Sequence, residues 1–290
     1  MHPKKSLKIA AWKIGSAASN ACLLLWIWVA DRLPSLRKPF KRAFYDWVMR
    51  ETIGDGSVFK LMNYGYASPG PNYFPISLDN SDRGELKFSW QLVYETVKNG
   101  RLAGKEVLVV GCGRGGDAYF VKRYMNAKKV TGIDFSKPAI EICRKNYRLE
   151  GLAFEVGDAE RLAFQDRQFD AAVDIESSHC YPRLSKFYRE VHRVLKPQGV
   201  FLYADFFWEK NHKSLLEEAG FKILEEAEIT QNIVLAAERG YQQRKEWIQK
   251  LAPKYLFNEM MEWSGTRGTR MYWRFKKGLL PYKRFVLVRD

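Results

Sequence analysis

The chain has 290 residues, of which 46% are hydrophobic and 14% aromatic, so it is large enough for a sizeable core and is not globally disordered. Its formal net charge is +15. Residues 1–50 hold ten basic and two acidic residues and residues 240–290 hold twelve and four, so the centre of the chain is close to neutral.

The basic flanks suit an anionic membrane, an acidic substrate or simply a solvated surface. Nucleic acid is disfavoured, because the sequence has no recognised binding motif and its centre is neutral. The cysteines are scattered and lack the spacing of a metal site. They predict a reducing, cytoplasmic location and no structural metal. These residues are Cys22, Cys112, Cys143 and Cys180.

Residues 1–57 form a basic and apolar extension ahead of the main domain, which we place at 58–290. The apolar run at 21–30 has ten residues, whereas a helix needs about 20 to cross a bilayer. Trp26 and Trp28 lie in this run between two groups of cations. This pattern favours peripheral attachment to an anionic membrane surface. The alternative is that the run packs on the main domain or on a second subunit of a homo-oligomer.

Beyond this extension, Tyr64 and Tyr66 precede a loop rich in Pro, Gly and Asn, and residues 85–97 are predicted to be a helix. A strand over 107–110 then runs into the glycines of 111–116, and a helix is predicted over 117–125. A second strand over 129–133 delivers Asp134 to the same edge of the sheet, where its carboxylate can accept hydrogen bonds from ribose hydroxyls.

This βαβ unit predicts a nucleoside-binding site, and two cofactors fit the glycines alone. Gly111, Gly113 and Gly116 match the GxGxxG pattern of dinucleotide-binding enzymes, but that pattern is weak by itself. Three later features point elsewhere. The strand 153–156 leads to Asp158, and the strand 169–175 leads to residues 176–181. A helix over 186–195 then leads through residues 196–199 to a strand over 200–204.

This ordered series resembles the class I S-adenosylmethionine-dependent methyltransferases. Residues 176–182, 202–205, 265–272 and 280–290 look like those of the phthiotriol/phenolphthiotriol dimycocerosate methyltransferases, which O-methylate hydroxyls of long polyketide lipids. The similarity covers roughly residues 58–290. One departure is Val109, which stands where the family usually has an acid near the methionine end of the cofactor.

The resemblance implies a Rossmann-like α/β fold: a seven-stranded, mostly parallel sheet with helices on both faces and a last, antiparallel strand over 282–289. It also implies S-adenosylmethionine as the cofactor, with Tyr64 closing over it; the alternative is that Tyr64 and Tyr66 are ordinary aromatics. The residues predicted to bind the cofactor are Tyr64, Gly111, Cys112, Gly113, Gly115, Asp134, Phe135, Ser136, Asp158, Ala159, Glu160 and Ile175.

For the chemistry, His179 is the candidate general base, because an imidazole is suited to removing a hydroxyl proton near neutral pH. The alternative is a structural histidine that lines the cleft. Glu176 is the second candidate catalytic residue, and we expect it to orient the cofactor or the histidine, or to cap the loop.

Residues 228–262 have the spacing of amphipathic helices and are predicted to form a lid over a hydrophobic small-molecule or lipid substrate, although they could equally be core. Tyr66, Tyr181 and Tyr241 are the candidate substrate-binding residues. The favoured function is O-methylation of a lipid or polyketide hydroxyl. The alternatives are C-methylation of a sterol or isoprenoid, and a cofactor-binding cyclase or scaffold that transfers no methyl group.

Overall fold

The computed structural model describes residues 60–70, 77–79, 87–208, 211–251, 254 and 257–290, with a few positions between 39 and 49. The chain separates into two units, Met1–Tyr45 and Asp46–Asp290, whereas the sequence placed the boundary after residue 57. The run at 21–30 lies outside the described residues. No helix in the described part of the chain has both the length and the apolar character needed to cross a membrane.

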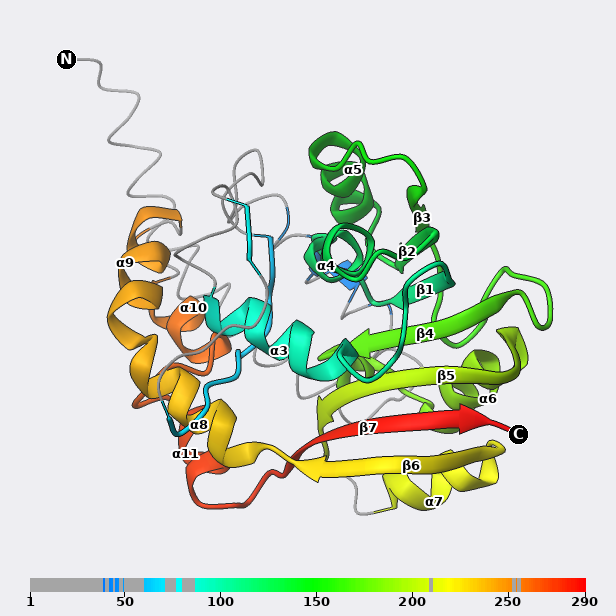
Figure 1. Ribbon diagram of the computed structural model, residues 1–290. Helices are drawn as coiled ribbons and strands as arrows, with labels where there is room; N and C mark the ends of the chain where they lie inside the picture. Colours follow the sequence, from blue (N-terminus) through cyan, green and yellow to red (C-terminus); the bar gives the residue numbers. More distant parts are fainter. Residues whose placement is uncertain are drawn as a thin grey trace. The chain divides into compact units, whose positions relative to one another are not determined.

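The second unit is built on one seven-stranded sheet in the order β3-β2-β1-β4-β5-β7-β6 (Figure 1). All neighbouring pairs from β3 to β5 are parallel, and β7 is antiparallel to both of its neighbours, as predicted. The fold is therefore the Rossmann-like class I methyltransferase arrangement. The strands are β1 (Glu106–Val110), β2 (Lys129–Asp134), β3 (Leu152–Val156), β4 (Phe169–Ile175), β5 (Leu195–Phe206), β6 (Phe221–Glu228) and β7 (Tyr282–Arg289).

The central strands are apolar on both faces because helices cover both sides of the sheet. In β1, Val107 and Val109 face one core and Leu108 and Val110 face the other. The first core includes side chains of α3 (Lys87–Val97), α4 (Gly116–Tyr124) and α5 (Lys137–Asn146). The second includes side chains of α6 (Leu184–Val194) and α7 (His212–Glu218).

The β5 strand begins earlier than predicted. The sequence prediction placed its start at Val200, after the polar segment 196–199, but Leu195 already pairs with Phe169 of β4. The register then shifts before Ala171 pairs with Val200, and Gln198 has φ 59°. The polar segment is therefore accommodated as an irregularity within the strand pair.

Four helices lie at the end of the sheet to which β4, β5 and β6 point (Figure 1). They are α8 (Thr230–Arg239), α9 (Tyr241–Leu251), α10 (Phe257–Trp263) and α11 (Arg270–Lys276). The predicted lid corresponds to the first three, although residues 252–253 and 255–256 lie outside the described part. Ile233 and Val234 of α8 and Phe275 of α11 are buried in the same core as α3. Part of this group therefore belongs to the core.

Candidate active site

The carboxyl ends of β1 and β4 lie side by side at the point where the strand order reverses, which is where open α/β sheets bind ligands. Gly111 directly follows β1 and has φ +61°. A Cβ atom there would lie 2.1 Å from Ser177 Oγ, so only glycine fits the turn. The glycine loop and the segment after β4 are thus packed directly against each other.

Asp134 ends β2 beside this loop. Its carboxylate accepts hydrogen bonds from Gly113 N at 2.9 Å and Ser136 N at 2.8 Å. Burial raises the pKa of Asp134 to about 6, against the opposing effect of these donors. The carboxylate is fixed at the strand end and retains lone pairs that two ribose hydroxyls can use. This arrangement fits a nucleoside cofactor.

The neighbouring predicted cofactor residues complete this edge of the sheet. Cys112 is buried, and its backbone N–H donates to Ile133 O at 2.9 Å, which joins β1 to β2. Gly115 N donates to Cys112 O at 2.7 Å and tightens the turn. Phe135 is half-buried, and Ser136 caps α5 through its hydroxyl. Val109, the departure from the family pattern, is buried in the apolar core.

The predicted cofactor-binding residues that follow β3, Asp158 and Glu160, make hydrogen bonds to other groups of the protein. Asp158 Oδ1 accepts from Glu160 N at 2.9 Å. The Glu160 carboxylate accepts from Arg183 N at 2.7 Å and from its guanidinium at 3.3 Å, so it holds the start of α6. Ala159 and Ile175 are buried in the two cores.

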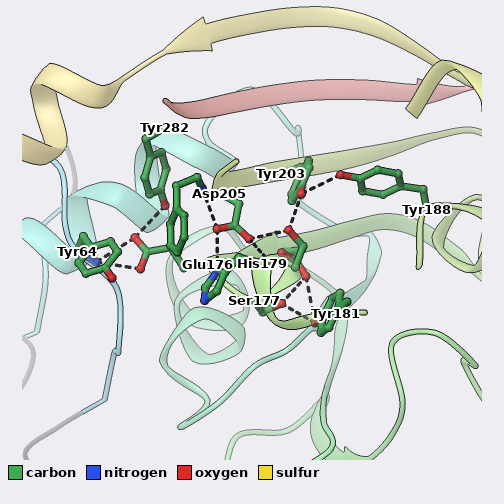
Figure 2. Close-up of polar contacts among 12 residues, drawn as sticks. Tyr64, Glu176, Ser177, His179, Tyr181, Tyr188, Tyr203, Asp205 and Tyr282 are labelled. Carbon is green, nitrogen blue, oxygen red and sulfur yellow. Dashed lines mark hydrogen bonds and ion pairs between the residues drawn. The ribbon is translucent and has the colours of Figure 1, made fainter. Parts of the chain in front are cut away.

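His179 follows β4 in a short 3-10 turn and lies against Asp205 of β5 (Figure 2). Its Nδ1 is 2.9 Å from Asp205 Oδ1, and its backbone N–H donates to Oδ2 at 3.0 Å. The Asp205 side chain is completely buried, whereas 18% of the His179 side chain is exposed. A carboxylate that accepts from Nδ1–H leaves Nε2 as the acceptor of a proton.

Besides His179, two further groups donate hydrogen bonds to the Asp205 carboxylate. Ser178 Oγ donates to Oδ2 at 2.6 Å, and Phe206 N donates to Oδ1 at 2.8 Å. Ser178 Oγ is also 2.5 Å from Tyr203 Oη, which continues the network to Tyr188 at 3.0 Å. Several donors stabilise an ionised carboxylate in a buried position. Asp205 is therefore well placed to position His179.

Two opposing effects set the basicity of His179. Burial disfavours the charged imidazole, but the interactions with Cys180 and Asp205 outweigh it and raise the pKa of His179 well above its ordinary value. The Phe206 ring stacks on the imidazole, with 4.3 Å between the ring centroids. The histidine is thus a strengthened base with a fixed orientation.

Glu176 does not hold the histidine in this structure. Its carboxylate accepts from Tyr64 N at 2.9 and 3.1 Å and from Tyr282 Oη at 2.9 Å, as Figure 2 shows. Burial raises the pKa of Glu176 to about 8. Arg244 of α9 holds the same segment from the other side, since it donates to Tyr64 O at 3.2 Å. Glu176 therefore fixes residues 60–67, which we call the Tyr64 segment, beside the end of β4.

The three predicted substrate residues are not brought together. Tyr181 Oη is 2.5 Å from Ser177 Oγ and donates to Asp174 Oδ2 at 3.3 Å, so it lies beside the glycine turn. Tyr66 lies near α3, where burial, followed by the charge of Glu95, raises its pKa. Tyr241 begins α9, and its ring contacts the Lys245 ammonium.

Asp205, Tyr282 and Arg244 are site residues that sequence reasoning missed. Asp205 belongs to a motif used only for the family resemblance, and its position at the end of the strand next to β4 was the available signal. Tyr282 was assigned only to a strand. Nothing in the sequence placed Arg244, because the residues it holds near Tyr64 lie about 180 residues away along the chain.

A family model described as a methyltransferase domain matches residues 102–258. The chain is 32% identical to a fatty-acid O-methyltransferase of Mycolicibacterium smegmatis, over 86% of this chain and 89% of that protein. It is 30% identical to a phthiotriol/phenolphthiotriol dimycocerosates methyltransferase of Mycobacterium tuberculosis, over 87% and 93%. These matches confirm the resemblance predicted from the motifs.

The fold is similar to that of a geranyl diphosphate C-methyltransferase from Streptomyces coelicolor A3(2), solved with S-adenosyl-L-homocysteine. The TM-score is 0.61 at 12% identity, and the match covers 88% of this chain and 98% of that one. At this identity the likeness concerns the fold alone. On the family model and the two relatives, the chain belongs to the methyltransferase-domain family and is an S-adenosylmethionine-dependent methyltransferase.

Proposed function

We propose that the protein transfers the methyl group of S-adenosylmethionine to a hydroxyl oxygen of a hydrophobic lipid or polyketide. The observation that carries this proposal is the contact between His179 Nδ1 and Asp205 Oδ1. A neutral hydroxyl must lose its proton when it is methylated, and an oriented imidazole paired with a carboxylate is suited to accept it. The bound cofactor supplies the activated methyl group.

The residues divide this work between them. Asp134 and the glycine loop hold the nucleoside, Glu176 and Arg244 hold the Tyr64 segment across the strand ends, and His179 removes the hydroxyl proton through Nε2. Aromatic rings pack beside the candidate base: Phe206 stacks on His179 and contacts Tyr64 and Phe275 at centroid distances of 5.9 and 5.8 Å. Apolar surroundings of this kind suit a hydrophobic substrate. The named substrates of the two relatives, fatty acids and phthiotriols, agree with this class.

A carboxyl oxygen is the second candidate acceptor. The raised pKa of His179 favours an imidazolium, which would attract a carboxylate and would not need to remove a proton. One relative is named a fatty-acid O-methyltransferase, and this name supports a carboxyl acceptor as the second candidate. The two acceptors predict different bonds in the product.

The test uses S-adenosylmethionine with a labelled methyl group and a lipid extract. A methyl ester is cleaved by alkali, a methyl ether resists alkali but is cleaved by hydriodic acid, and a C-methyl group resists both. We expect the label in the ether fraction, and its loss with the His179→Ala variant. Label confined to the ester fraction would select the carboxyl acceptor, and label resistant to both treatments would select C-methylation.

A further inference from the structure

One surface beside the active site combines exposed aromatic and aliphatic side chains with cations. We call it the aromatic–basic surface: Trp208, Trp273, Arg274, Lys277 and Leu279. The three apolar side chains are among the most exposed large hydrophobics in the described chain, at 57%, 47% and 71%. The surfaces of soluble proteins rarely gather exposed apolar side chains in this way unless they bind a partner.

These residues form one patch because α11 and the end of β5 meet there. The Arg274 guanidinium lies 5.0 Å from the centroid of the Trp208 ring, and Leu279 N donates to Arg274 O at 2.9 Å. Trp273 immediately precedes Arg274, and Lys277 N donates to Trp273 O at 3.0 Å. The patch therefore spans α11 and the two loops beside it.

The charge of the patch is positive. Residues 263–289 contain no Asp or Glu and eight Lys or Arg. Two exposed cations of α11 are paired with acids of neighbouring helices, Arg270 with Glu262 and Lys276 with Glu238. Within the described part of the chain, Arg274 and Lys277 have no ion pair. Their charges are available to an anionic partner.

The patch is also connected to the candidate base. The Phe206 ring contacts Trp208 at a centroid distance of 6.0 Å and stacks on His179 at 4.3 Å. Phe206 also contacts Phe275 of α11 at 5.8 Å. A continuous series of aromatic rings thus leads from the exposed surface to the imidazole.

We infer that the aromatic–basic surface docks on an anionic lipid bilayer. Tryptophan prefers the headgroup region, and cations near it are attracted to anionic lipids. Docking there would let a hydrophobic acceptor pass from the bilayer along Phe206 to His179 without crossing water. The inference rests on the proposed lipid substrate for its purpose, but the docking itself is measured without any methyl transfer.

The first test is sedimentation of the full-length protein with vesicles, using the double variant Lys277→Glu/Leu279→Ala. The matched control is Lys222→Glu/Leu224→Ala on β6, which has the same two substitutions at the same spacing, with Leu224 54% exposed. The vesicles contain equal parts of phosphatidylglycerol and phosphatidylcholine. Removing one cation changes such binding by about fivefold, so we expect the Lys277→Glu/Leu279→Ala variant to partition at least fivefold less than the control.

The second test is local and separates this surface from any binding by residues 1–57. Leu279→Cys and Leu224→Cys are each introduced into a Cys22→Ser/Cys180→Ser background, in which the remaining Cys112 and Cys143 are buried, and are labelled with an environment-sensitive nitrobenzoxadiazole group. We expect anionic vesicles to shift the emission to the blue only for Leu279→Cys, and pure phosphatidylcholine to do so weakly. No shift at position 279 would overturn the inference. Loss of a dimer in the Lys277→Glu/Leu279→Ala variant without vesicles would also overturn it, since a second copy of the chain would then be the partner.

Discussion

His179 and Asp205 come from separate parts of the chain, and the parallel pairing of β4 with β5 brings them together. Asp205 receives donors on both oxygens, so its completely buried side chain is hydrogen-bonded on each of them. Its effect on the histidine is to fix the ring and to raise its pKa. In the proposed mechanism the pair separates two tasks, since Asp205 orients the imidazole and His179 accepts the proton.

Replacing His179 by Ala should reduce methyl transfer by about 10²–10⁴-fold, the usual contribution of a general base. Cofactor affinity should change little, because His179 interacts with Asp205, Phe206 and Cys180, whereas the glycine loop and Asp134 are proposed to hold the nucleoside. Turnover assays and calorimetry with S-adenosylmethionine measure the two effects. Near-normal turnover in a folded variant would exclude the base role.

Replacing Asp134 by Asn should weaken S-adenosylmethionine binding by about 1.5–3 kcal/mol, the range for a hydrogen bond to a charged group. Because the pKa of Asp134 is about 6, wild-type affinity should also fall as the pH is lowered through 6 and the carboxylate takes up its proton. Calorimetry measures both effects. Asp170→Asn, at the opposite end of β4, is the matched control.

Among the structural elements, the candidate site depends on the hydrogen bonds that hold the Tyr64 segment in place. Glu176 accepts its N–H, while Arg244 of α9 donates to its carbonyl. Glu176 has φ +53°, a conformation unfavourable for a residue with a side chain, so the surrounding structure must maintain it. One buried carboxyl thus links the end of β4, the Tyr64 segment and the start of β7.

Glu176→Gln should keep this link, because the amide oxygen can still accept from Tyr64 N and Tyr282 Oη, whereas Glu176→Ala should release it. Hydrogen exchange over residues 60–67 measures the difference. Faster exchange in the Ala variant alone is the expected result, and equal exchange in both variants would contradict the link.

The pKa of Glu176 also predicts a pH effect on stability. Between about pH 4.5 and pH 8 the unfolded state ionises while the folded state keeps its proton, so a rising pH favours unfolding. Wild type should therefore lose stability relative to Glu176→Gln by up to about 1.4 kcal/mol per pH unit in that window. Denaturant unfolding at several pH values tests this, and a difference independent of pH would show that Glu176 is already ionised in the fold.

The sequence predicted the central strands well because each is a short apolar run that ends in a glycine or a polar residue. It did not identify β6, because this strand packs on one side only and its residues alternate between exposed and half-buried positions. Charged residues such as Glu225 and Glu226 therefore obscure the apolar pattern. Edge strands with one covered face carry the weaker signal.

The candidate site was predicted only in part for a related reason. Asp134 and His179 follow recognisable strands, so their places at the carboxyl edge could be inferred. The partner of His179 could not, since Glu176 is nearer in the sequence but Asp205 is nearer in space. Contacts across strands depend on register and side-chain direction, which a single sequence does not contain.

For the whole molecule, the near-neutral centre of the sequence holds most of the candidate active site, whereas the last fifty residues contribute a strong positive charge. In the structure part of this charge lies on α11, beside the exposed Trp208 and Trp273. The protein thus combines a Rossmann-like core with a basic surface at the end of the sheet where the substrate would enter. This arrangement agrees with an acceptor drawn from a lipid phase.

The most direct test of the proposed O-methylation is the pH dependence of single-turnover methyl transfer to a lipid alcohol, compared between wild type and Asp205→Asn. A base of raised pKa predicts a wild-type rate that increases with pH on the alkaline side of 6.5. Removing the carboxylate should lower the pKa of His179, shift the increase to lower pH and reduce the maximal rate. A rate that falls as the pH rises, or the same pH profile in both proteins, would contradict proton removal by the His179–Asp205 pair.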